Sequence, residues 1–254
     1  MILRLATTFF LTATAGFAAT NTLPEKEIEG GKIVRQILEA RPAANYTNAG
    51  VLKIRAAKNS TAQIPIRFEV FLTPTNWVSV YQMMSSNGTS PSIRLRVIRQ
   101  NGNNRYELAT LTTDDACCPT NTILVGAQAM MPFAGSDFWL ADLGLEFLHW
   151  PVQRLLKKEL RRNQSCYVLE SINPAPGTNG YSRVVSWLDI DSVRDAGQPA
   201  IIHADAYDAH GKLLKAFDPK SLEKVNGQYQ LQEMEIRNLQ TGSRTRIEFK
   251  FDSE

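Results

Sequence analysis

The chain has 254 residues, of which 43% are hydrophobic and 21% are charged. This is an ordinary globular composition, which excludes an intrinsically disordered chain and a protein embedded throughout in a membrane. The 28 basic and 25 acidic residues leave a net charge of +3, a balance that argues against a nucleic-acid-binding protein.

The N-terminal residues predict an export signal. Arg4 places a positive charge near the start, and residues 5–19 form a run of apolar and small residues. Residues 16–18 read Gly-Phe-Ala, with small residues at the two positions that a signal peptidase recognises. A membrane anchor is the alternative, but the run is shorter than the roughly 20 apolar residues of a span. We therefore expect a cleaved signal peptide at residues 1–18 and a single domain at residues 19–254.

Residues 23–41 predict an amphipathic helix. Apolar residues such as Ile33 and Ile37 recur at the spacing of one helical face. Pro42 ends the pattern because a proline disfavours the helical conformation in the residue before it. The pair Gly30-Gly31 weakens the first half of the helix. Its expected role is to cover a sheet.

From Tyr46 onward, apolar residues recur with the period of two that is typical of strands. In residues 64–70, for example, Ile64, Ile66 and Phe68 alternate with other residues. Turn-forming pairs separate such runs, and Asn101-Gly102 is a strong hairpin signal. We count about ten or eleven strands against two helical regions, with no alternation of strands and helices. The chain is therefore predicted to be mainly β (α+β), with a meander of antiparallel strands.

The middle of the chain interrupts the strands. Residues 114–135 lack a regular pattern and are interpreted as irregular structure, with a loop or short strand near residues 126–132. Residues 137–150 crowd several leucines and aromatic residues together before Pro151. They predict one or two short helices that are apolar on more than one side.

Three cysteines bear on the redox environment. An oxidising compartment permits one disulfide and leaves one thiol over. A bond between the neighbours Cys117 and Cys118 would need a strained ring, so we expect Cys117 or Cys118 to pair with Cys166. No histidine or cysteine lies at a ligand spacing around them, so no metal site is expected.

Other polar residues give little sign of chemistry. The basic residues of 154–162 are interpreted as a solvated face, with contact to anionic headgroups or an acidic partner as the alternative. The scattered His149, His203 and His210 are interpreted as surface or turn residues. Asp189, Asp191 and Asp195 could serve acid–base chemistry or bind calcium, but a polar turn is favoured. No known catalytic or nucleotide-binding motif is present, so we expect neither an enzyme nor a cofactor.

The second half of the chain resembles a known family. Gly135-Ser136-Asp137-Phe138 followed by Asp142-Leu143 resembles a signature of the bacterial outer-membrane lipoprotein-sorting family, the LolA/LolB-like group. Here residues 139–141, Trp-Leu-Ala, replace the more polar residues expected after that signature. The segments that resemble the later strands of the family are residues 166–170, 187–189, 207–212, 234–238, 241–242 and 245. The match covers roughly residues 133–254, and the earlier half agrees in layout only.

The resemblance implies an unclosed, curved antiparallel barrel with helices covering its concave side. It also implies a periplasmic, possibly outer-membrane-associated carrier that holds lipid or lipoprotein acyl chains without catalysis and that has envelope membrane proteins as further partners. Two rival hypotheses are a structural or adaptor protein on the same scaffold and a hydrolase that uses the aspartate cluster.

An apolar groove of this kind would be lined by residues from the strands and from the 137–150 region. An ordinary core position is the alternative interpretation for each of them. The expected lining residues are Phe68, Val70, Trp77, Val80, Leu95, Val97, Leu140, Leu143, Leu148, Val185 and Trp187.

Overall fold

The structure, a computed structural model, describes residues 23–57, 60–84, 92–99, 103–111, 120–192, 200–225 and 228–251. Strands β1 to β6 span Tyr46–Arg55, Thr61–Leu72, Trp77–Met83, Ser92–Arg99, Asn104–Leu111 and Thr120–Leu124. Strands β7 to β13 span Val152–Arg161, Gln164–Ile172, Tyr181–Asp189, Ala200–Asp208, Leu213–Val225, Gln228–Asn238 and Arg244–Lys250. The helices α1, η1, α2 and η2 span Leu23–Glu39, Gly126–Ala129, Leu140–Leu143 and Glu146–His149.

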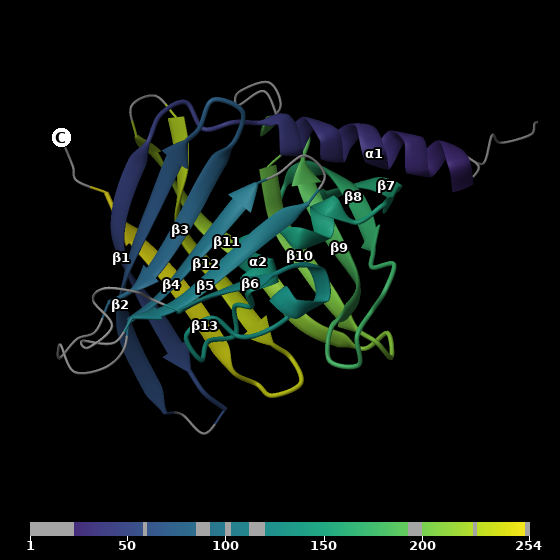
Figure 1. The fold of residues 1–254 in the computed structure, drawn as a ribbon. Helices are drawn as coiled ribbons and strands as arrows, with labels where there is room; N and C mark the ends of the chain where they lie inside the picture. The colour runs from purple at the N-terminus through teal and green to yellow at the C-terminus, as the bar shows by residue number, and fades with distance from the viewer. Residues whose placement is uncertain are drawn as a thin grey trace, which may run out of the picture.

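All of these strands belong to one antiparallel sheet in the order β6-β5-β4-β3-β2-β1-β13-β12-β11-β10-β9-β8-β7. Each half of the chain forms a meander, and the pairing of β1 with β13 joins the two halves. Strands β6 and β7 stand at the two edges, and no pairing between described residues joins them. The sheet is therefore a curved, unclosed barrel, as Figure 1 shows.

The mainly β fold class is confirmed, but the strand count of ten or eleven was too low. The structure has thirteen described strands. One of them, β6, lies in the region interpreted as irregular. Its sequence, Thr-Asn-Thr-Ile-Leu, is short and lacks the alternation of an inner and an outer face. A short edge strand of this kind gives almost no periodic signal.

The connection from β6 to β7, residues 125–151, passes from one sheet edge to the other through the concave side. We call it the crossing segment. It contains η1, α2 and η2, so the expected short helices of residues 137–150 are confirmed. Its apolar side chains pack into two clusters, with Phe138 and Leu140 in the first and Phe147 and Leu148 in the second. The crossing segment thus fills part of the interior of the barrel. This position explains why this part of the sequence is apolar on more than one side.

The predicted N-terminal helix is α1, which packs on the edge strand β7 (Figure 1). Ile33 and Val34 are buried in the second cluster, and Arg154 on β7 donates to Glu27 at 3.0 Å. Gly30 faces the β7 backbone so closely that a Cβ atom there would collide with the carbonyl oxygen of Gln153. None of the described helices is long and apolar enough to cross a membrane. The predicted signal peptide lies outside the described residues, and the single domain stays a prediction.

The basic residues of 154–162 all have partners among the described residues. The pairs are Arg154 with Glu27, Lys157 with Glu159, Lys158 with the Tyr167 ring, Arg161 with the Trp187 ring, and Arg162 with Asp218. These charges are engaged in contacts within the fold, which agrees with the interpretation of a strand face.

A buried carboxylate on β11 organises the convex face. Asp218 accepts from Arg162 at 2.7 Å and from Arg237 at 3.1 Å, and it contacts Nδ1 of His203 at 2.7 Å. The other imidazole nitrogen of His203 lies 3.0 Å from Asp205. The interpretation of His203 as a surface or turn residue was therefore wrong, because strand β10 carries it into this buried ion-pair network.

The network shifts the pKa of both central groups. Burial alone would lower the pKa of His203, but its hydrogen bonds with Asp205 and Asp218 and their negative charges outweigh burial and raise it. Burial alone would raise the pKa of Asp218, but the hydrogen bond with His203 and the nearby cations hold it well below its usual range. The charged pair is therefore favoured by the folded state.

We predict that Gly30→Ala destabilises the protein and that Gly31→Ala does not. The added methyl at position 30 must displace α1 from β7, at a cost of roughly 1–3 kcal/mol in the free energy of unfolding. A Cβ at position 31 meets nothing within 4 Å, so Gly31→Ala should stabilise α1 by up to about 1 kcal/mol. Chemical unfolding measures both variants. Equal midpoints for the two would contradict the close docking of α1 on β7.

We also predict a loss of stability above neutral pH that depends on His203. Because its pKa is raised above the ordinary 6.5 in the folded state, the stabilisation is fully present below pH 6.5. It is lost as the pH rises through the folded-state pKa, and each pKa unit is worth about 1.4 kcal/mol. His203→Gln should remove this part of the pH dependence of unfolding, whereas His210→Gln in the exposed β10–β11 turn should leave it. An unchanged slope in His203→Gln would refute the assignment.

Candidate functional site: an apolar cavity beneath the crossing segment

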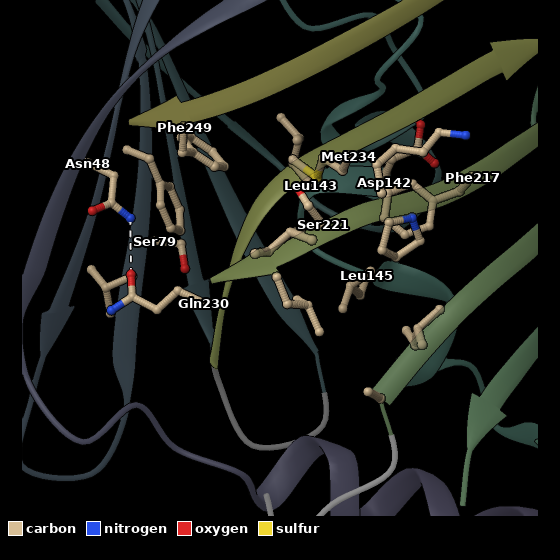
Figure 2. A pocket seen from close by; sticks show the side chains of 18 of the residues that line it. Asn48, Ser79, Asp142, Leu143, Leu145, Phe217, Ser221, Gln230, Met234 and Phe249 are labelled. Carbon is tan, nitrogen blue, oxygen red and sulfur yellow. Dashed lines mark hydrogen bonds between the residues drawn. The ribbon is translucent and has the colours of Figure 1, made fainter. Parts of the chain in front are cut away.

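A cavity of about 620 Å³ lies between the concave face of the sheet and the crossing segment. Its volume is within the roughly 300–1,000 Å³ of typical ligand pockets. Figure 2 shows Asn48, Ser79 and Phe249 on one side, with Leu143 and Phe217 on the other. Most of the lining side chains are apolar, so the cavity suits a hydrocarbon ligand.

One wall is an aromatic group centred on Phe68 of β2. The Phe68 ring centroid lies 4.7 Å from that of Tyr81, 5.4 Å from that of Phe249 and 5.9 Å from that of Tyr46. Four neighbouring strands supply these rings, which their alternation directs to the concave face. Burial raises the pKa of both Tyr46 and Tyr81, so their hydroxyls stay protonated. This wall is apolar and uncharged.

The opposite wall includes the crossing segment at the bend between α2 and η2. Leu143 and Leu145 line the cavity on either side of Gly144. Leu145 adopts a left-handed conformation with φ 51°, which redirects the chain into η2. A Cβ atom on Gly144 would collide with the Tyr106 hydroxyl. The bend therefore needs a glycine at position 144, and it brings the two leucines to the cavity.

Asp137 fastens the start of this wall to the last strand. Its carboxylate accepts from Ser243 at 2.5 Å and from Thr245 at 2.9 Å, while its own N–H donates to Thr245 at 2.9 Å. The crossing segment is thus tied to β13 by charge-assisted hydrogen bonds.

Lys215 of β11 fastens the next turn. Its ammonium is buried, donates to the Asp137 carbonyl at 2.7 Å and to Asp142 at 3.4 Å, and lies 3.5 Å from the centroid of the Trp139 ring. Tyr181 stacks on Trp139 with centroids 4.6 Å apart and donates to Asp142 at 2.8 Å. Burial lowers the pKa of Lys215 to about 8, against the opposing effect of Asp142.

A polar cluster adjoins the cavity at the ends of β4 and β5. Glu146 accepts from Tyr106 at 2.9 Å and from Asn104 at 3.2 Å. Arg99 lines the cavity opposite Asn104 in the β4–β5 register, with its guanidinium 5.0 Å from the centroid of the Trp77 ring. Burial raises the pKa of Glu146 and lowers that of Arg99.

The structure brings four of the eleven expected lining residues together at the cavity, namely Phe68, Val70, Trp77 and Leu143. Leu95, Val97 and Leu140 are packed in the first core cluster, and Leu148 is packed in the second. Val80 and Val185 are buried outside both clusters. Trp187 contacts Glu159, Arg161 and His203 on the convex face. Lipid contact by any of the eleven stays a prediction.

Sequence reasoning missed several lining residues. Tyr46 and Tyr81 occupy inward positions in the same alternation that indicated Phe68, so a strict count of every second residue could have found them. Phe217 occupies an inward position of β11 and could have been found in the same way. Leu145 gave no signal, because its position at the cavity depends on a left-handed bend. Arg99 gave none either, because a cation is not expected among cavity-lining apolar residues.

The remaining predictions concern residues away from the cavity. Cys166 is buried, but Cys117 and Cys118 lie outside the described residues, so the disulfide stays a prediction. Asp189 accepts from the backbone N–H of Asp191 at 3.0 Å, as a polar turn requires, and Asp195 is outside the described residues. Within the described ranges, no group of three histidine, cysteine or acidic residues could hold a metal ion.

Comparisons with known proteins agree with this architecture. A DUF1329 family protein from Desulfovibrio piger superposes with a TM-score of 0.70 at 16% identity, covering 89% of this chain and 91% of the other. A proposed outer membrane lipoprotein-sorting protein domain from Vibrio parahaemolyticus gives 0.68 at 17% identity, covering 89% and 92%. A LolA superfamily protein from Nitrosomonas europaea gives 0.52 at 14% identity, covering 91% and 93%. At these identities the likeness concerns the fold.

The fold expected from the LolA/LolB-like resemblance is therefore confirmed. No curated protein matches the sequence significantly. A family model with the description "Uncharacterized protein" matches residues 121–252, slightly more than half of the 254 residues. This match includes the crossing segment and the whole C-terminal meander. The chain belongs to this family of uncharacterised proteins, and it has the fold of LolA superfamily structures.

Proposed function

We propose that this protein is a periplasmic lipid carrier that holds an acyl chain in the cavity without catalysis. The observation that carries the proposal is the 620 Å³ of space with mainly apolar walls between the sheet and the crossing segment. Protein interiors are normally close-packed, and a solid core would be enough to bury the apolar face of this sheet. A cavity of ligand size therefore favours a protein that binds a ligand there.

The size of the cavity supports one acyl chain at a time. If a methylene group takes about as much space as a liquid water molecule, roughly 30 Å³, a 16-carbon chain needs about 500 Å³. Each buried methylene is worth about 0.8 kcal/mol, so such a chain offers roughly 13 kcal/mol before ordering costs. The cavity of about 620 Å³ is large enough for one chain of this length and too small for two.

Two further observations support a carrier in the bacterial envelope. The solved structure from Vibrio parahaemolyticus, which shares the fold, is described as a proposed outer membrane lipoprotein-sorting domain. The N-terminal residues of this chain have the pattern of an export signal. Together they support a proposed activity in the periplasm, where an acyl chain needs protection from water during transfer between membranes.

The rival hypotheses fit less well. A structural or adaptor protein on this scaffold would be expected to pack solidly beneath the crossing segment, whereas this interior contains the cavity. A hydrolase built on the aspartate cluster would need those carboxylates beside a substrate pocket. Asp189 instead caps a turn at the end of β9 and is absent from the cavity lining.

We predict that Val70→Trp prevents binding of a neutral acyl probe and that Phe71→Trp does not. Val70 lines the cavity, so an indole there fills part of the space that the chain would occupy. Phe71 is the next residue of β2 and is exposed on the other face, which makes it a matched control. Titration with a fluorescent 16-carbon alcohol should show at least tenfold weaker binding to Val70→Trp than to the wild type.

Thermal unfolding should be measured on both variants so that misfolding is not mistaken for lost binding. Ser79→Phe, which fills the cavity from β3 opposite Val70, serves as an independent second variant. The proposal fails if the wild type does not bind the probe and if native mass spectrometry of protein purified from the envelope finds no lipid. If folded Val70→Trp and Ser79→Phe bind the probe as tightly as the wild type, the probe binds outside the cavity and the proposal is contradicted.

A further inference from the structure

Arg99 is a charged residue in a cavity whose lining is mostly apolar. It is the last residue of β4 and lines the cavity beside Trp77 and Tyr46. The alternation of β4 directs Leu95, Val97 and Arg99 to the same concave face. The first two are fully buried in the core, so the third brings a cation to the face that carries this part of the core.

The guanidinium of Arg99 lacks a polar partner among the described residues. Its Nε atom is buried without a hydrogen bond, and no carboxylate of a described residue forms an ion pair with it. Its one specific contact is the face of Trp77. Asn104, directly opposite on β5, uses its amide nitrogen to donate to the Gly144 carbonyl at 2.8 Å and leaves its own oxygen unpaired as well.

The nearest acidic side chain does not compensate for this. Glu146 contributes a favourable electrostatic effect on Arg99, but its carboxylate is hydrogen-bonded to Tyr106 and Asn104. Glu146 makes no ion pair with the Arg99 guanidinium, and burial raises the pKa of its carboxyl. Arg99 itself stays protonated because an arginine is not neutralised in proteins. The cavity therefore contains a half-buried positive charge that forms no hydrogen bond or ion pair with the described residues.

The other cations at the cavity differ in this respect. Arg162 and Lys220 also line it, but both pair with Asp218, at 2.7 Å and 3.9 Å. A single free guanidinium matches a singly charged acceptor with two oxygens. Arginine binds a carboxylate through two parallel hydrogen bonds, and this geometry is lost with lysine.

We propose that Arg99 binds the carboxylate of a free fatty acid whose hydrocarbon chain fills the cavity. This inference rests on the proposed function and names its ligand class. The carboxylate lies at the β3–β4 side of the cavity, and the chain extends towards Phe217 and Met234 on β11 and β12. The fatty acid supplies an anionic partner that no described residue provides at this position, so binding has a fixed orientation.

Paired ligands of equal chain length test the proposal. Palmitate and hexadecanol are titrated against the wild type, Arg99→Gln and Arg96→Gln. Arg96 lies on the same strand, is exposed and pairs with Glu107, so it controls for general loss of positive charge. The wild type and Arg96→Gln should bind palmitate at least tenfold more tightly than hexadecanol. Arg99→Gln should lose this preference while its affinity for hexadecanol stays within about threefold of the wild type.

The outcomes separate this proposal from the proposed function. Equal affinity of the wild type for palmitate and hexadecanol would overturn the role of Arg99 and leave the carrier function intact. Binding of neither ligand would overturn both. A preference for palmitate that persists in Arg99→Gln would show that another group binds the carboxylate. If Arg99→Gln does not fold, Arg99→Lys, which keeps the charge but not the two-point geometry, should show a weakened preference; an unchanged one would overturn the proposal.

Discussion

The interior of this protein depends on the buried ammonium of Lys215. It extends from β11 into the concave side and contacts the crossing segment at the Asp137 carbonyl and the Asp142 carboxylate, with Trp139 covering it. A buried charge costs free energy unless its hydrogen-bonding partners are all in place, so the segment can occupy only one depth inside the sheet. That depth decides how much of the interior the segment fills and how much remains as the cavity.

Three of the residues that resemble the lipoprotein-sorting family, Asp137, Asp142 and Thr245, take part in this anchor. Asp137 of the signature meets Thr245 of the closing strand, and Asp142 meets Tyr181 and Lys215. Their role is to hold a segment across an open sheet, which is a requirement of the architecture whatever the cargo. In the proposed carrier, selection among ligands would come from the walls of the cavity, where the aromatic group around Phe68 and the cation of Arg99 are found. The fold itself is shared with solved structures at only 14–17% identity.

The sequence predicted the sheet well because alternation and turn residues are local signals, and it predicted the apolar crossing segment from composition. It predicted the site poorly because both faces of several strands are buried. On β3, Val78 and Val80 are buried on the face opposite Ser79 and Tyr81, so an apolar pattern did not identify the concave face. On β9, Trp187 is covered on the convex side by Arg161. Long-range contacts of this kind have no periodic signature.

Two of the three arginines of β4, Arg96 and Arg99, show why the sequence did not identify the site, and what this means for binding. Positions 96 and 99 differ by an odd number, so Arg96 points outward to Glu107 while Arg99 enters the cavity. In sequence they are equivalent basic residues, and only the surroundings make one a surface charge and the other an unpaired cation. The free energy of binding a hydrocarbon comes from buried area, to which a guanidinium adds little. In the proposed carrier its effect is on selection, because a ligand that fills the cavity without an anionic group leaves the Arg99 charge without a partner among the described residues.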